Sequence, residues 1–456
     1  MSSTGDKLVT TRRAVLGALT AGALGAALWP RAPRSRADIP AGRTVLTYWE
    51  KWTGAEGEAL QRVVDRFNTS QDAIWVRRVP VADIVPKAMV AIAGGDPPDL
   101  VGLYSFNIPA FAESQAALAL DDLAPFGDRI DPAIYAPAVD RLLHYQGRQW
   151  AAVTSCYALG LYCNLAHFRA AGLDPAALPR TISQLDHAAE RLTRKAPTGQ
   201  IEQTGFQQNL PQWWPYFWPV LFGSELYDPR LDRPTIADPP GVAAFSWISD
   251  TARRLGIAES RSLARTYDRS FHTAADPFFS GRASMIVQGP WLASFARSAA
   301  PSLDFACVPV PMADAVFDPS APLGMVEADV VVIPRGCPHP QESMTFIRFL
   351  QRQDVLEELA QAHGKSSPLA AVSPSFLPTH PNPQVRAFDA VIRSRRAVIL
   401  PQTRVWQQYA DMTSGAFDRA WSGEPAQVVL NEVQARAQEL MSTATARRQA
   451  REAAAQ

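Results

Sequence analysis

The chain has 456 residues, of which 47% are hydrophobic and 19% are charged, and its 44 Lys and Arg residues balance 44 Asp and Glu residues. This composition is typical of a well-packed protein and excludes a disordered or fibrous one. The length exceeds what one ordinary hydrophobic core uses, so we expect two domains.

The first 37 residues have the features of an export signal. Arg12 and Arg13 stand before an apolar run over 14–29 that is short for a membrane span, and 35–37 (SRA) has the small residues of a cleavage site. The pattern resembles a twin-arginine signal, which exports proteins already folded. An ordinary export signal or a retained anchor stays open. No cysteine follows the apolar run, so we expect a periplasmic or cell-envelope protein that is not a lipoprotein.

Charge and motifs exclude several functions. Without residues 1–37 the chain keeps 38 basic and 43 acidic residues, a net charge of about −5, which gives no reason to expect nucleic-acid binding. The seven histidines show no metal-ligand spacing, and we expect no metal, cofactor or catalytic residue. We expect the cysteines to be buried free thiols, with a Cys307–Cys337 disulfide left open. They are Cys156, Cys163, Cys307 and Cys337.

Strands and helices alternate in the first part of the mature chain. Hydrophobic patterns predict strands over 44–49, 74–79 and 99–103, and helices over 54–68 and 82–93. This alternation favours a parallel α/β sheet.

The later segments repeat the pattern and then become helical. The predicted elements are a strand over 150–164, a helix over 182–195, a helix end and strand over 278–288, strands over 305–309 and 327–333, and one long helix over 340–363. A Pro/Ser-rich loop begins at 366, and helices follow to the C-terminus. No long linker separates the domains, so we expect more than one short crossing between them.

Five segments, in order, resemble one known family. They are 46–49 (LTYW) with 52–54 (WTG), 91–100 (AIAGGDPPDL), 161–164 (LYCN) with 168 and 171–173 (AGL), 279–285 (FSGRASM) with 289–291 (GPW), and 332–336 (VIPRG) with the following helix. The set is similar to that of the family 1 extracellular solute-binding proteins of carbohydrate ABC transporters. Residues 400–402 (LPQ) with Trp406 and Tyr409 resemble the maltose-binding branch. Cys163 departs from the family pattern, which has a second tyrosine there.

The resemblance implies an α/β protein of two lobes joined by a multi-crossing hinge, with the ligand in the cleft between them. We assign 42–154 and 329–369 to lobe I, and 155–328 and 370–456 to lobe II. The implied function is that of a monomeric receptor that binds a di- or oligosaccharide and delivers it to an ABC permease with a cytoplasmic ATPase.

Two other functions stay open from the sequence. A receptor of the same fold could bind a glycerol phosphodiester, which would require a cationic pocket. A secreted glycosidase would require two carboxyl groups about 5–10 Å apart, and Glu50 with Glu327 is the candidate pair.

Candidate contacts follow from what a sugar offers. Its ring faces pack on aromatic side chains, and its hydroxyls pair with planar polar groups. In the proline-broken stretch 209–225 (NLPQWWPYFWPVLFGSE), we expect Phe217 to face the core, and three other aromatic residues are candidates to face the cleft; which of them do so stays open. The predicted ligand contacts are Glu50, Trp52, Tyr104, Asn107, Trp214, Tyr216, Trp218, Trp291, Glu327, Arg404 and Trp406.

Overall fold

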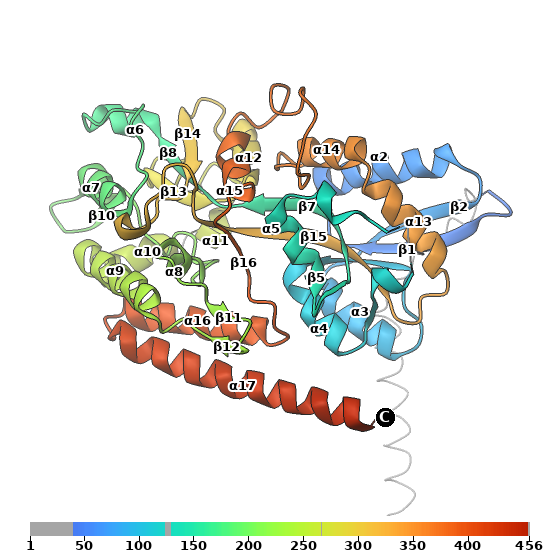
Figure 1. Cartoon of the computed structure of the whole chain (residues 1–456). Helices are drawn as coiled ribbons and strands as arrows, with labels where there is room; N and C mark the ends of the chain where they lie inside the picture. Colours follow the sequence, from blue (N-terminus) through green and yellow to red (C-terminus); the bar gives the residue numbers. More distant parts are fainter. Residues whose placement is uncertain (1–39, 124–128, 266, 455–456) are drawn as a thin grey trace, which may run out of the picture.

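The structure is a computed structural model that describes residues 40–123, 129–265 and 267–454, so the predicted export signal lies outside the described residues. Two lobes lie side by side, and strands near the middle of the molecule connect them (Figure 1). None of the described helices combines the length and the apolar character that a membrane span requires.

The sheet of the first lobe is mixed rather than parallel. Its strand order is β16-β15-β3-β1-β2, and β4 and β7 also pair with β15. β1 (Thr44–Glu50) is parallel to β2 (Ile74–Pro80) and β3 (Leu100–Tyr104), as the alternation predicts. β15 (Gly324–Pro334) is antiparallel to β3, because it enters from the second lobe and not through a crossover helix.

The helices of the first lobe match the apolar patterns except at one break. α2 (Gly54–Ser70) and α3 (Ile84–Ala93) lie where helices were expected. The predicted helix over 340–363 is two helices, α13 (Pro340–Leu350) and α14 (Gln353–Ala362). The break has a cause: the buried side chain of Gln351 accepts from the Tyr135 hydroxyl and donates to the carbonyl of Val153, and Arg352 is extended.

The sheet of the second lobe has three antiparallel strands, β13 (Met285–Gln288), β8 (Gly160–Asn164) and β14 (Phe305–Pro309). The strand predicted over 150–164 is therefore two, because β7 (Ala152–Ala158) belongs to the first sheet. The chain crosses between the lobes at Leu159. The segment 278–284, expected to end a helix, forms turns.

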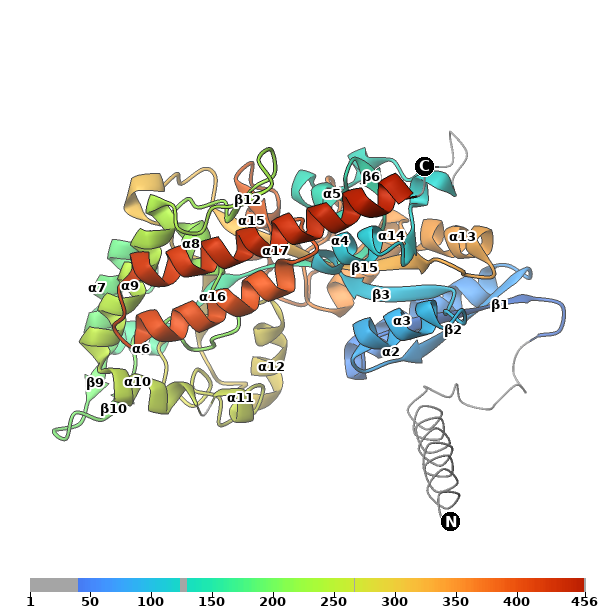
Figure 2. The same ribbon diagram turned by 90° about the horizontal axis from the view of Figure 1, so that it is seen from below.

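The C-terminal part of the chain wraps the second lobe with helices. α17 (Ala426–Ala454) packs on α16 (Trp406–Trp421) and α9 (Pro239–Leu255). Figure 2 shows α17 continuing past the second lobe and beneath the first. The other elements are α4 (Ile108–Glu113), β4 (Ala117–Leu118), α5 (Pro137–Leu143), β5 (His144–Tyr145), β6 (Arg148–Gln149), α6 (Leu165–Ala170), α7 (Ile182–Leu192), β9 (Arg194–Lys195), β10 (Ile201–Gln203), α8 (Phe217–Leu221), β11 (Tyr227–Asp228), β12 (Arg233–Pro234), α10 (Ile257–Ala264), α11 (Tyr267–Ser270), α12 (Trp291–Ala299), α15 (Val385–Ile392) and β16 (Ala397–Ile399), with short 3₁₀ turns at 105–107, 120–122, 132–134 and 314–316.

The cysteine prediction is confirmed. All four cysteines are free and buried. The disulfide left open between Cys307 and Cys337 is not formed, because the two residues lie in different lobes: Cys307 is on β14, while Cys337 contacts Asp99.

Candidate functional site

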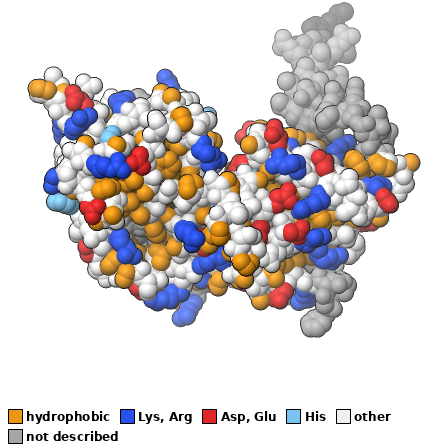
Figure 3. Space-filling model, turned by 90° about the horizontal axis from the view of Figure 1, so that it is seen from above, with side chains coloured by type: hydrophobic (Ala, Val, Ile, Leu, Met, Phe, Trp, Pro, Cys, Tyr) orange, Lys and Arg blue, Asp and Glu red, His pale blue; other side chains and the backbone are white. Residues whose placement is uncertain are grey.

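The surface is hollowed between the two lobes (Figure 3). α2 of the first lobe and α12 of the second lie on the facing sides of this cleft (Figure 2). Two predicted contacts stand at the start of these helices, Trp52 just before α2 and Trp291 as the first residue of α12. The predicted lobe boundaries at 154 and 328 fall within β7 and β15, which lie at the junction, and the division stays a prediction.

On the second lobe, an aromatic cluster is formed by Tyr157, Trp214, Tyr216 and Trp291, all half-buried. The Trp291 ring lies 5.2 Å from the Tyr157 ring, edge to face, and 6.3 Å from the Trp214 ring. Gly289 makes this position possible, since a Cβ there would lie 2.2 Å from the Trp291 ring. The cluster therefore keeps apolar ring surface accessible on this side.

The stretch 209–225 divides its aromatic residues between the core and the surface. Phe217, which begins α8, is 1% exposed, as expected for a core residue. Trp218, a predicted contact, is 4% exposed and packs against Phe206 and Trp247 within the lobe. The half-buried aromatic residues of the stretch are Trp213, Trp214, Tyr216 and Phe222. Trp214 and Tyr216 pack against the hydrophobic core of this lobe and keep part of their rings accessible.

Glu327 lies on β15 directly opposite Tyr157 of β7. Its side chain is 3% exposed, and its Oε2 accepts a hydrogen bond from the Tyr157 hydroxyl at 2.5 Å. Burial raises the pKa of Glu327 to about 7, although the hydrogen bond from Tyr157 opposes this shift.

On the first lobe, a charged network joins Glu50, Lys51, Glu56, Asp329 and Lys365. Asp329 lies between the two lysines, 3.0 Å from the Lys51 ammonium and 3.3 Å from that of Lys365. Lys51 also contacts Glu50 at 3.4 Å, and Lys365 contacts Glu56 at 3.3 Å. Burial alone would raise the pKa of Asp329, but the two ammonium groups lower it to about 2.

Two predicted contacts of the first lobe, Trp52 and Tyr104, lie against the charged network. The Trp52 ring is 6% exposed and is flanked by Lys51 at 5.2 Å and Lys365 at 5.4 Å. Tyr104 is 38% exposed, and Lys51 lies 4.6 Å from its ring. Tyr104 therefore presents more ring surface to solvent than Trp52 does.

Glu50 and Asn107 have structural partners in this conformation. Glu50 is fully buried, and its two oxygens accept from the Tyr48 hydroxyl and from the backbone N–H of Lys51, both at 2.7 Å. The carboxylate packs on Gly102, where a Cβ would lie 2.0 Å from it. The Asn107 side chain accepts from the backbone N–H of Tyr104 at 3.2 Å and so fixes the turn after β3.

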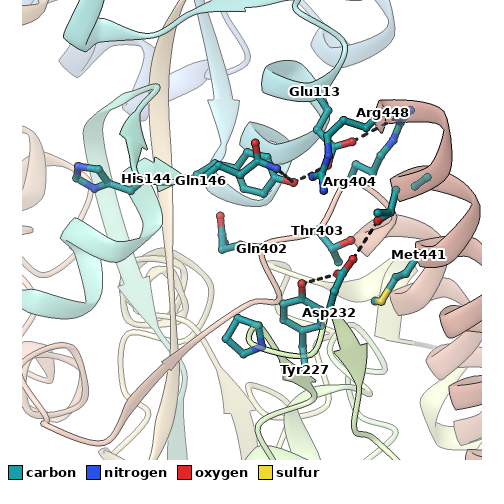
Figure 4. A pocket seen from close by; sticks show the side chains of 14 residues that line it. Glu113, His144, Gln146, Tyr227, Asp232, Gln402, Thr403, Arg404, Met441 and Arg448 are labelled. Atoms are coloured by element: carbon teal, nitrogen blue, oxygen red, sulfur yellow. Dashed lines mark hydrogen bonds and ion pairs between the residues drawn. The ribbon is translucent and has the colours of Figure 1, made fainter. Parts of the chain in front are cut away.

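The last two predicted contacts, Arg404 and Trp406, do not stand beside the accessible rings of the aromatic cluster. Arg404 lines a cavity of about 360 Å³ with Glu113 and Arg448, beside the last turns of α17 (Figure 4). Its guanidinium lies 3.5 Å from the Glu113 carboxylate, and that of Arg448 lies 3.6 Å from it. Trp406 is 3% exposed and packs behind Tyr216, 5.0 Å from its ring.

Three residues of the site were missed by the sequence analysis. Asp329 had a signal, because it is two residues after Glu327 on the same strand and so shares its face. Tyr157 and Lys365 had none: the partner of Tyr157 depends on the strand register, and Lys365 follows a helix whose break was not foreseen. No group of His, Cys, Asp and Glu within the described ranges could hold a metal ion.

Comparison with known proteins confirms the fold. The profile of a family described as bacterial extracellular solute-binding protein matches residues 62–383. The structure of CpMnBP1 with mannobiose bound is 24% identical in sequence, and the alignment covers 87% of this chain and 100% of that one with a TM-score of 0.74. The sugar-binding protein MalE from Xanthomonas citri is 17% identical, and the alignment covers 88% of this chain and 98% of that one with a TM-score of 0.72.

A third similar structure carries a different kind of ligand. UgpB from Mycobacterium tuberculosis, in complex with glycerophosphocholine, is 21% identical, and the alignment covers 88% of this chain and 99% of that one with a TM-score of 0.70.

A sequence search against curated proteins found no match. The family profile covers more than half of this chain, and the alignments with the similar structures cover nearly the whole length of those proteins. The chain therefore belongs to the bacterial extracellular solute-binding protein family.

Proposed function

We propose that this protein is the substrate-binding receptor of an ABC importer and that it holds a neutral di- or oligosaccharide in the cleft between its lobes. The aromatic cluster carries the proposal. Half-buried rings at Trp214, Tyr216 and Trp291 offer apolar faces that suit the C–H faces of a sugar. Tyr104, which is 38% exposed, would add a ring from the first lobe, and the predicted contacts Trp52 and Glu327 would complete the proposed site.

The charges of the first lobe favour a neutral solute over a phosphodiester. Lys51 and Lys365 are cations that flank the Trp52 ring, and each pairs with Asp329 and a second carboxylate. An anionic ligand would have to compete with these buried partners for the ammonium groups. Arg404, the other cation considered from the sequence, pairs with Glu113.

The candidate carboxyl pair, Glu50 and Glu327, does not support a glycosidase. Hydrolysis requires two carboxyl groups that can reach the scissile bond. Glu327 is a candidate for one of them, but both oxygens of Glu50 are bonded and the side chain is fully buried. We therefore infer binding without covalent chemistry, in keeping with a family of binding proteins.

Transport would use the connection between the lobes. β15 and the β7–β8 crossing at Leu159 are the segments about which the lobes could close on a ligand. The closed monomer would then dock on the permease, which works with a cytoplasmic ATPase. Residues 1–37 would direct export by the twin-arginine route to the periplasm or the outer side of the cell envelope, without a lipid anchor.

A thermal-shift screen tests this function. Mannobiose, maltose and glycerophosphocholine are each added in excess to the purified mature chain, because a ligand that binds only the folded state raises the unfolding midpoint. We expect at least one of the two disaccharides to raise the midpoint and glycerophosphocholine to leave it unchanged. A shift with glycerophosphocholine alone would make the proposed solute class wrong, and release of monosaccharides would contradict a binding-only role.

A further inference from the structure

One buried carboxylate oxygen at the base of the aromatic cluster has no partner. Glu327 is 3% exposed, and its Oε2 accepts from the Tyr157 hydroxyl, but its Oε1 has no hydrogen-bond partner among the described residues. Buried polar atoms are nearly always paired, because an unpaired one loses its bonds to water without replacement. An unpaired oxygen in this position therefore indicates a missing donor.

The residues around Glu327 leave it available. Tyr157 holds one oxygen, and the Tyr157 ring contacts Trp291. Lys51 and Lys365 pair with Asp329, two residues after Glu327 on β15, and appear in no described ion pair with Glu327. Burial and the nearby Glu327 carboxylate also raise the pKa of Tyr216, but no hydrogen bond joins the Tyr216 hydroxyl to Oε1 of Glu327.

We propose that Glu327 and Tyr157 form a specificity pair, in which Oε1 of Glu327 accepts a hydrogen bond from one hydroxyl of a carbohydrate packed against Trp291. This inference rests on the proposed function. Tyr157 fixes the orientation of the carboxyl group, and the ligand hydroxyl supplies the missing donor. A sugar without that hydroxyl leaves the oxygen unpaired, and a site built to bond a hydroxyl discriminates strongly against an analogue that lacks it.

Calorimetric titration of three proteins tests the pair. They are the wild type, Glu327→Gln and Glu202→Gln, the last a matched control because Glu202 is exposed on β10. The probes are mannobiose and maltose. We expect Glu327→Gln to bind the disaccharide that the wild type binds about 10- to 100-fold more weakly, the loss that corresponds to one hydrogen bond to a charged group. Glu202→Gln should bind as the wild type does. Unchanged affinity in Glu327→Gln would overturn the proposal.

A second measurement separates direct contact from distortion of the site. The same proteins are titrated with monodeoxy forms of the disaccharide that binds. We expect one deoxy form to lose affinity for the wild type and to show no further loss for Glu327→Gln, because both changes remove the same bond. If every deoxy form is weakened by the same factor in both proteins, Glu327 does not contact a hydroxyl and the proposal is wrong.

The two proposals fail in different ways. If neither disaccharide binds the wild type but glycerophosphocholine does, the proposed solute class is wrong. Glu327→Gln is then titrated with glycerophosphocholine, which also carries hydroxyl groups. A loss of affinity would keep the role of Glu327 as a hydroxyl acceptor, and equal affinity would overturn that role as well.

Discussion

The two sides of the cleft use different physical interactions. On the first lobe, the charged network supplies its own partners: Lys51 and Lys365 both pair with Asp329 and flank the Trp52 ring. On the second lobe, the rings of the aromatic cluster pack on one another and on neighbouring rings such as Trp406, and they remain half-buried. The charged groups of the first side are paired within the protein, while the second side keeps apolar ring surface accessible.

This difference predicts different results from mutation. A change of charge on the first lobe leaves buried groups without partners, so it should affect stability first. Loss of a ring on the second lobe removes surface that a ligand would cover, so it should affect affinity first. The following predictions test this comparison in order of decreasing effect.

The largest expected effect is that of Asp329→Asn. The substitution leaves the buried ammonium groups of Lys51 and Lys365 without their shared carboxylate, and breaking a buried ion pair costs about 3–5 kcal/mol. Urea unfolding followed by circular dichroism should show the midpoint at a lower urea concentration. Asp72→Asn is the matched control, because Asp72 pairs with Arg43 but is fully exposed. Equal small effects of the two substitutions would show that the network does not stabilise the first lobe.

Trp291→Ala should be the most severe change for binding. Truncation of a central ring at a binding site commonly costs about 2 kcal/mol or more, which is about 30-fold in affinity. Calorimetry with mannobiose and maltose measures the loss. Trp75→Ala is the control: Trp75 is a half-buried tryptophan on β2, at the edge of the sheet. Loss of the folded circular dichroism spectrum in Trp291→Ala would instead assign this ring to the core.

Glu327 should make stability depend on pH. Burial raises the pKa of Glu327 from 4.5 to about 7; Tyr157 of β7 opposes the shift, and Asp329 of the same strand adds to it. Below pH 4.5 the carboxyl group is protonated in both states. Between pH 4.5 and pH 7 the unfolded chain releases this proton while the folded protein retains it, so stability falls across this window and levels off above pH 7. Relative to the wild type, Glu327→Gln should gain roughly 2 kcal/mol between pH 5 and pH 8. A pH-independent difference in urea midpoints would contradict the prediction.

The alternation of strands and helices predicted much of the fold, because it depends on local hydrophobic patterns. β1, α2 and β2 lie where the patterns place them. The predictions failed where distant contacts decide the structure: Gln351 breaks a long helix by bonding to Tyr135 and Val153, and β15 reverses its direction because it arrives from the other lobe. Such contacts leave no periodic signal in the sequence.

The site was predictable in residue type more than in position. Trp214, Tyr216 and Trp291 were singled out. The Trp291 ring contacts those of Trp214 and Tyr157, and the Tyr216 ring packs on Trp406. The same reasoning could not separate Trp218 from them, since both kinds of tryptophan occur in one proline-broken stretch. Aromatic content predicts a candidate binding surface, but the packing of the whole lobe decides which rings stay half-buried and which are buried.

Tyr104→Ala should have the smallest effect and sharpens the comparison most directly. Tyr104 is the most exposed of the predicted aromatic contacts, and its ring is held by Lys51 and by Phe106, which stacks on it at 5.3 Å. Because much of the ring stays in water, we expect only about a two- to fivefold loss of affinity for the disaccharide that binds, well below that of Trp291→Ala. Tyr104→Phe keeps the ring and serves as the control. Equal losses for Tyr104→Ala and Trp291→Ala would mean that both lobes supply ring surface equally, and the contrast between a charged side and an aromatic side would no longer describe how this protein binds its ligand.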